Sequence, residues 1–145
     1  MVSSTSNEFI TTRDWHRAIV GGKNLILRNT SALEHLQLFS GYVKERTIDV
    51  YARRRGEYEN INYHVVDTFD SIDYLCIGNV LCTSVSQTIN DMLSDYSNID
   101  EQSLIEGLSK FFYMNNGFDG LSIKPENIER FNGIRDWAIE YYDEV

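Results

Sequence analysis

Residues 81–93 read LCTSVSQTINDML, and within this stretch a predicted sheet gives way to helices. Leu81 to Thr83 ends a short strand, and Ser84-Val85-Ser86-Gln87 then forms a capping box. In such a box the first side chain accepts a hydrogen bond from the backbone of the fourth residue, whose side chain returns to the first. Thr88 and Asp91 lie one helical turn further on, too far away to form a nucleophile–base pair with Ser84. We therefore predict that Ser84 and Gln87 are structural capping residues.

The chain before this joint predicts two helices followed by two strands. A short helix is expected over residues 9–20, and Gly21-Gly22 ends it. Ser31-Ala32-Leu33-Glu34 is a second capping box, so Ser31 and Glu34 are predicted to cap a helix that begins there. From Arg46 the apolar residues recur with a period of two, which predicts strands around residues 48–52 and 61–65.

Residues 74–83 predict a hairpin with Gly78-Asn79 at its bend. With a two-residue loop, Cys76 faces Leu81 and the two thiols point to opposite sides of the sheet. With a three-residue loop, Cys76 would lie directly across from Cys82. Two cysteines do not make a disulfide scaffold, and we expect buried free thiols.

The remainder of the chain is predicted to be helical. Apolar residues recur at helical spacing over 85–93, over 104–112 and from Pro125 to the terminus, with Pro125 in a first turn. The predicted fold is α+β: a small, mainly antiparallel sheet with short helices before it and three packed helices after it. We expect one domain over residues 1–145, with a disordered segment at 1–8 and an acidic C-terminal helix within 118–145.

The formal charge of −9 is concentrated in the C-terminal part, where residues 91–145 hold 12 of the 22 acidic side chains and 4 of the 13 basic ones. This surface would repel phosphate backbones and attract a basic protein, so direct DNA binding is not expected. A run of three arginines is the only basic cluster. The candidate partner-binding residues are therefore Arg53, Arg54 and Arg55 in the run, and Asp136, Trp137, Glu140, Tyr141 and Asp143 in the last helix.

No coherent catalytic or metal-binding pattern is present in the sequence. His16, His35 and His64 lie on three separate elements without metal-ligand spacing, so neither a metal nor a cofactor is expected. Cys82 with His64 is the only nucleophile–base pair that could be assembled, across neighbouring strands. Asp49 with Glu57 or Asp67 could hold Mg²⁺, but the second strand lacks the lysine that such nucleases use. Without a membrane span or signal peptide, the expected location is the cytoplasm.

The order of these elements resembles the C-terminal domain of the AbiEi family, antitoxins of type IV toxin–antitoxin systems that act in phage abortive infection. The resemblance covers residues 25–112, and related segments also occur ahead of some restriction-like nuclease domains. It is carried by Ser31-Ala32-Leu33 with Leu36, by Ile48-Asp49-Val50, by Tyr63-His64-Val65, and by Thr83-Ser84 with Thr88 and Asp91.

The resemblance implies a non-enzymatic antitoxin-like domain that counters a nucleotidyltransferase-type toxin through a protein–protein interaction. Family members usually carry an N-terminal winged helix that represses their own operon. Some thirty residues precede Ser31, too few for that domain, so autoregulation is not expected here. Two alternatives stay open: a divergent magnesium-dependent restriction-like nuclease, and an acidic inhibitor of a basic partner. The sequence leaves the oligomeric state open.

Overall fold

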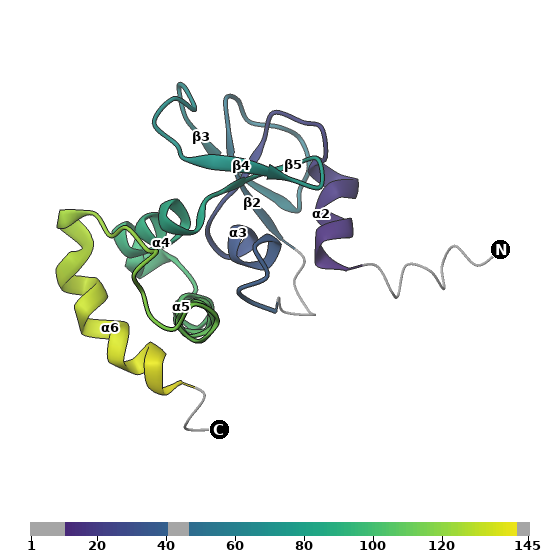
Figure 1. The fold of residues 1–145 in the computed structure, drawn as a ribbon. Coiled ribbons are helices and arrows are strands. Elements are labelled where there is room, and N and C mark those ends of the chain that lie inside the picture. Colours follow the sequence, from purple (N-terminus) through teal and green to yellow (C-terminus); the bar gives the residue numbers. More distant parts are fainter. Residues whose placement is uncertain (1–10, 41–46, 142–145) are drawn as a thin grey trace.

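The computed structural model describes residues 11–40 and 47–141, which form a mixed α+β fold. Figure 1 shows the sheet on one side of the molecule and the later helices packed together on the other. The α+β class, with short helices before the sheet and three helices after it, is confirmed. The predicted disordered segment at 1–8 and the candidate residue Asp143 lie outside the described residues.

The sheet has five strands in the order β3-β2-β1-β5-β4. The pairs β1/β2 and β4/β5 are antiparallel, and the pairs β1/β5 and β2/β3 are parallel, so the pairings divide equally. Residues 53–60 connect the parallel strands β2 and β3 without a helix, and they are exposed throughout. The strands are β1 (Ile26–Leu27), β2 (Ile48–Ala52), β3 (Ile61–Val65), β4 (Tyr74–Ile77) and β5 (Val80–Thr83).

The first helix, α2 (Thr12–Val20), begins at a capping box that the sequence prediction missed. The Thr11 side chain accepts from the backbone of Asp14, and the Asp14 carboxylate accepts from the backbone of Thr11. Because these bonds satisfy two free N–H groups of the first turn, the helix begins at Thr12. Residues 9 and 10 of the predicted helix lie outside the described residues.

The predicted capping role of Ser31 and Glu34 is wrong. Helix α3 (Asn29–His35) begins two residues earlier, with Arg28 at its N-cap and no side-chain cap. The Ser31 hydroxyl accepts from the backbone N–H of Asp49 at 2.9 Å, so it ties α3 to β2. Glu34 points toward His16 instead of back to the helix start, with its Oε1 3.8 Å from Nε2 of His16. The sequence matches the capping-box pattern, but both side chains contact residues of other elements instead of the helix start.

The hairpin of β4 and β5 is confirmed, with Gly78 and Asn79 at positive φ (60° and 65°) as a tight two-residue turn requires. Cys76 pairs with Leu81, and both cysteines are free. Cys82 is buried, and its burial raises the pKa of the thiol to about 12. The predicted burial of Cys76 is wrong, because β4 is an edge strand and this thiol is exposed.

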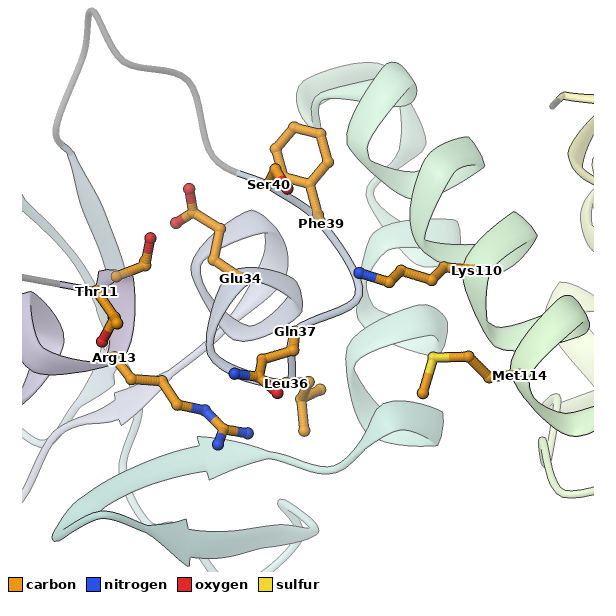
Figure 2. A pocket seen from close by; sticks show the side chains of 10 residues that line it. Thr11, Arg13, Glu34, Leu36, Gln37, Phe39, Ser40, Lys110 and Met114 are labelled. Carbon is orange, nitrogen blue, oxygen red and sulfur yellow. The ribbon is translucent and has the colours of Figure 1, made fainter. Parts of the chain in front are cut away.

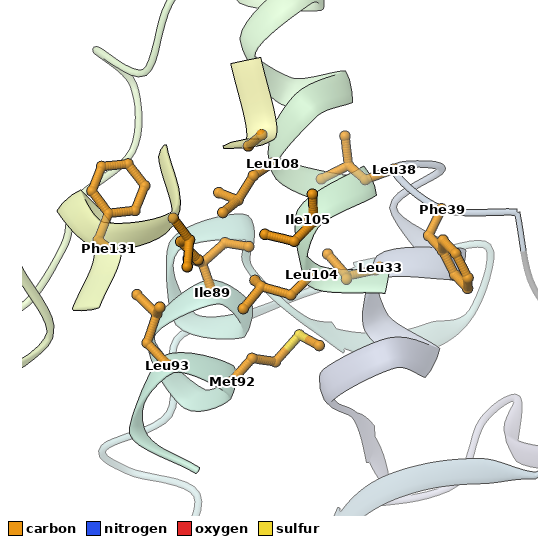
Figure 3. Packing of buried hydrophobic residues seen from close by; sticks show 12 residues of the cluster. Leu33, Leu38, Phe39, Ile89, Met92, Leu93, Leu104, Ile105, Leu108 and Phe131 are labelled. Atoms are coloured by element: carbon orange, nitrogen blue, oxygen red, sulfur yellow. The ribbon is translucent and has the colours of Figure 1, made fainter. Parts of the chain in front are cut away.

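Three helices follow the sheet: α4 (Val85–Ser94), α5 (Glu101–Asn115) and α6 (Ile128–Glu140). Short 3₁₀ turns at Tyr96–Asn98 and Pro125–Asn127 connect them, with Pro125 in the first turn as expected. Their inner faces meet in an apolar core that Figure 3 shows in detail, with side chains from α3, α4, α5 and α6. Its fully buried members include Leu33, Ile89, Met92, Leu104, Ile105 and Leu108.

Helix α3 lies between the sheet and the helical layer. Ala32 packs in the apolar cluster against the sheet, whereas the neighbouring Leu33 packs in the helical core. Gly107 allows α5 to approach, because a Cβ atom there would lie 3.2 Å from both methyl carbons of Leu33. The two cores are thus joined through one short helix.

A buried asparagine pair fixes the segment before α6. Asn90 of α4 donates to the carbonyl of Ser122 at 2.8 Å, and its side-chain oxygen accepts from the backbone of Lys124 at 2.9 Å. Asn127 donates to the same oxygen at 3.0 Å. Buried amides are costly unless paired, so these bonds set the path of the chain into α6.

Candidate functional site

Polar side chains from the sheet and from α4 meet where β5 passes into that helix. The Tyr51 hydroxyl of β2 donates to Oδ2 of Asp91 at 2.6 Å, and the Gln87 amide donates to Oδ1 of the same carboxylate at 2.9 Å. The side-chain oxygen of Gln87 accepts from the backbone of Asp73 at 2.9 Å. We call these side chains, together with Ser84 and Thr88, the joint.

Ser84 caps α4 as predicted, and its hydroxyl accepts from the backbone of Gln87 at 3.2 Å. The return bond from Gln87 is not formed. The backbone N–H of Ser84 donates instead to the carbonyl of Asp73 at 2.9 Å, because the approaching β4 segment supplies that partner. Thr88 donates to the carbonyl of Ser84 and contacts the hydroxyl of Thr83, both at 2.6 Å. The hydroxyls of Thr83, Ser84 and Thr88 thus form hydrogen bonds that hold the connection between β5 and α4, and Ser86 does not take part.

Burial shifts the pKa values around the joint. The pKa of Tyr51 rises to about 12, first through burial and then through the hydrogen bond to Asp91. Burial also raises the pKa of Asp49, against a hydrogen bond from Asn62. The His64 ring lies edge-on to Tyr51 at 5.4 Å, and its pKa is lowered by burial and then by Arg28. All three shifts favour the neutral form.

The structure brings together positions that are far apart in the sequence. Ser31 bonds the backbone of Asp49; the Tyr51 ring lies between Arg28, whose Cζ is 4.7 Å from its centroid, and the hydrogen-bonded Asp91. These contacts hold α3 against β2 and β2 against α4.

The catalytic pairs considered from the sequence are not assembled. Strands β2 and β1 separate His64 on β3 from the buried Cys82 on β5, so the expected neighbourhood of these two residues is wrong. Glu57 lines a cavity with Lys23, away from Asp49, and Asp67 is exposed. Among residues 11–40 and 47–141, no three His, Cys, Asp or Glu side chains gather into a metal-binding group.

Two histidines meet in the interior, although their sequence positions gave no sign of it. His16 of α2 and His35 of α3 are buried, with their Nδ1 atoms 3.0 Å apart, and His35 Nε2 lies 2.9 Å from the carbonyl of Ile77. A carbonyl can only accept, so His35 donates from Nε2 and its neutral ring accepts at Nδ1 from His16. Burial lowers the pKa of His35, consistent with a neutral ring.

A cavity of about 550 Å³ lies beside the histidine pair. Figure 2 shows side chains from α2, from α3 and the residues after it, and from α5 around this space. Arg13 and Lys110 bring positive charge and Glu34 brings negative charge, with Leu36, Phe39 and Met114 as apolar wall. Arg13 is held in place by a 2.7 Å bond from its Nε to the carbonyl of His35. The cavity is thus mixed in charge.

The outer face of α6 carries most of the predicted acidic candidates. Asp136 and Glu140 are exposed, and the indole of Trp137 is 44% exposed. Tyr141 is half-buried, and its hydroxyl donates to Glu106 at 3.3 Å, so it belongs to the helix packing. We call Glu129, Asp136, Trp137 and Glu140 the α6 face.

The sequence analysis missed a hollow beside this face. A cavity of about 500 Å³ is lined by Tyr96, Glu126, Glu129, Arg130, Gly133 and Ile134. The space over Gly133 is open, since a Cβ atom at this position would meet no other atom within 4 Å. A glycine in the middle of an amphipathic helix was the available signal.

The three arginines lie at the end of β2 and are exposed. Arg54 and Arg55 line a third cavity, whereas Arg53 does not. They follow Tyr51 of the joint closely in sequence but share none of the joint's hydrogen bonds among the described residues.

Comparisons with models of protein families, with curated proteins and with solved structures found no match. Within the described residues, none of the helices has the length and apolar character needed to cross a bilayer.

Proposed function

We propose that this chain is a non-enzymatic, antitoxin-like regulatory domain that counters a nucleotidyltransferase-type toxin in an abortive-infection system by binding a protein partner. The AbiEi-like motif order suggests the class of partner. The observation that carries the interaction is the α6 face, where an exposed tryptophan lies among three carboxylates.

An exposed tryptophan beside charge is typical of the centre of a protein interface. Tryptophan is enriched among the residues that dominate binding energy, because it buries a large rigid surface with little loss of side-chain entropy. Glu129, Asp136 and Glu140 would speed association with a basic surface and select against acidic ones. The neighbouring hollow over Gly133 offers space for one side chain of the partner.

The joint supports a non-catalytic function. Its carboxylate, hydroxyl and amide groups bond one another and the backbone, and Tyr51, Asp49 and His64 are all biased toward the neutral form. A nucleophile needs a free approach to substrate, whereas the groups of the joint already bond one another and the backbone. These side chains therefore hold α4 against the sheet.

Co-expression with a nucleotidyltransferase encoded beside this chain is the direct test. The chain is expected to restore growth that the enzyme alone arrests. Trp137→Ala should abolish the rescue and weaken binding at least about thirtyfold, which corresponds to a hot-spot loss of about 2 kcal/mol.

Ile128→Ala is the matched control, since Ile128 is 46% exposed on the same helix. It should leave both rescue and affinity unchanged. Arrest that persists with the wild-type chain would refute the antitoxin function. Rescue by Trp137→Ala equal to that of wild type would place the contact elsewhere on the chain.

The open alternative of an acidic inhibitor predicts a different outcome for the same surface. A basic partner other than the nucleotidyltransferase would then bind the chain, with an affinity that falls steeply as salt screens the charges. Replacing Glu129 and Glu140 by glutamine would lower the association rate and flatten this salt dependence.

A further inference from the structure

A third cavity, of about 590 Å³, lies between two loops at the edge of the sheet. One wall is the loop after α2 (residues 23–25), and the other is the β2–β3 connection (residues 54–58). Tyr63 of β3 completes the lining. A hollow of this size is within the range of small-molecule sites, which run from roughly 300 to 1,000 Å³.

The side chains that line the cavity carry a net positive charge, opposite in sign to that of the whole chain. Lys23, Arg54 and Arg55 line it against one carboxylate, Glu57, whereas the whole chain carries −9. Neither arginine forms an ion pair with another of the described residues. Cations gathered around a concave surface concentrate the positive potential there, and an anion would be drawn to it.

Parts of the wall are fixed before any ligand binds. The Lys23 ammonium donates to the carbonyl of Ile19 at 3.0 Å and lies 4.8 Å from the centroid of the Tyr58 ring. Gly56 lies against the end of the Tyr63 ring, where a Cβ atom would be 2.3 Å from the Tyr63 hydroxyl oxygen. Only glycine permits this approach, so the loop that carries the arginines is seated on the sheet.

Tyr58 adds an aromatic surface to the cations. Its side chain is 57% exposed although it is large and apolar, and it lines the same cavity as both arginines. Guanidinium groups bind phosphate with paired N–H donors, and a tyrosine face can stack on a planar base. The two kinds of group recognise the two halves of one molecule.

We propose that this cavity binds a phosphorylated ligand with a planar ring, of the nucleotide class. Arg54 and Arg55 bind the phosphate, Lys23 adds charge to it, and Tyr58 stacks on the ring. An acidic protein segment would also satisfy the cations, but it would not need the exposed aromatic ring. The site is separate from the α6 face and does not depend on the antitoxin function.

Titration of the whole chain with AMP, followed by backbone amide NMR shifts at low salt, tests the proposal. Saturable shifts are expected for the amides of Lys23 and of residues 54–58. Replacing both Arg54 and Arg55 by glutamine should weaken AMP binding about tenfold or more, because each removes a charged hydrogen-bond donor. Arg53→Gln is the matched control: it removes the same charge from the same run but outside the cavity, and should change the affinity less than twofold.

Ribose 5-phosphate tests the stacking half of the proposal. It should bind more weakly than AMP, and Tyr58→Leu should bring AMP down to the same level. A single-stranded oligoadenylate should bind at the same amides if the ligand is the end of a nucleic acid and should bind no better than AMP if it is a free nucleotide.

Three results would overturn the proposal. These are an absence of saturable shifts with AMP, equal binding of AMP and ribose 5-phosphate with no effect of Tyr58→Leu, and tighter binding of a glutamate-rich peptide at these amides. All the substituted side chains are exposed, so the variants should fold, and far-ultraviolet circular dichroism checks this.

Discussion

The joint and the α6 face are both rich in polar and aromatic side chains, yet the structure uses them in opposite ways. In the joint, the carboxylate of Asp91 accepts from Tyr51 and Gln87, and the hydroxyls bond the backbone. On the α6 face, Trp137 and its carboxylate neighbours are directed to solvent. Residue types that suggest chemistry thus stabilise the fold in one place and remain available to a partner in the other.

Two large aromatic side chains on the same helix give the largest test of this contrast. Phe131 is 8% exposed in the helical core and Trp137 is 44% exposed. Phe131→Ala should lower the free energy of unfolding by about 3–5 kcal/mol, whereas Trp137→Ala should lower it by no more than about 2 kcal/mol, because the indole is only partly covered. Urea denaturation of both variants measures the difference. A loss above about 2 kcal/mol for Trp137→Ala would mean that the indole stabilises the fold and is not free for a partner.

The joint should respond strongly to loss of its central carboxylate. Asp91→Ala leaves the hydroxyl of the buried Tyr51 and the Gln87 amide without this acceptor, so a loss of about 2 kcal/mol in unfolding free energy is expected. Adding Tyr51→Phe should cost less in the Asp91→Ala background than in wild type, because the shared bond is already gone. Strict additivity in this double-mutant cycle would show that the bond contributes nothing.

The sequence predicted the elements correctly where the interactions that form them join residues close together in the chain. The hairpin turn, the Ser84 cap and the apolar faces of α4 to α6 depend on residues within one or two turns of each other. Ser31 and Glu34 matched a local pattern equally well, but a strand N–H and a buried histidine competed for them. The parallel pairing of β2 with β3 and the meeting of His16 with His35 are long-range, and no local spacing encodes them.

Of the candidate surfaces too, the one set by local spacing could be predicted from the sequence, and the one set by long-range contacts could not. Exposure of Asp136, Trp137 and Glu140 follows from the helical period, so the α6 face could be anticipated. The cavity around Arg54 and Arg55 could not, because Lys23 reaches it from the separate loop after α2. Tyr141 was assigned to the partner surface, but it is half-buried and bonds Glu106, a partner 35 residues away.

Substitution of Ser84, at the start of α4, should have a smaller effect on the unfolding free energy than substitution of Asp91. Ser84→Ala removes the acceptor for the backbone of Gln87, and the unfolding free energy should fall by about 1 kcal/mol. Ser84→Asp should recover most of this loss, since aspartate is also a good N-cap. Toxin rescue by both variants should equal that of wild type at a permissive temperature. A folded Ser84→Ala chain that selectively fails to rescue would move part of the function into the joint.

The last prediction concerns the pH dependence that His35 of the buried histidine pair adds to stability. The pKa of His35 is lowered from 6.5 by burial, with His16 and Arg13 also opposing its protonation and the carbonyl of Ile77 favouring it. Below pH 6.5 the histidine is protonated more readily in the unfolded chain than in the folded one. The contribution of His35 to the unfolding free energy is therefore fully present above about pH 7 and declines as the pH falls toward 5. One such group can contribute at most about 1.4 kcal/mol per pH unit.

His35→Gln keeps a donor for Ile77 but cannot titrate, and its unfolding free energy should fall less steeply between pH 7 and 5.5. His64→Gln is the matched control: its pKa is also lowered, but this histidine is exposed and its contribution should be smaller. An unchanged slope in His35→Gln would show that the buried pair accepts the proton in the folded chain, with Glu34, 3.8 Å from His16, as the carboxylate that balances it.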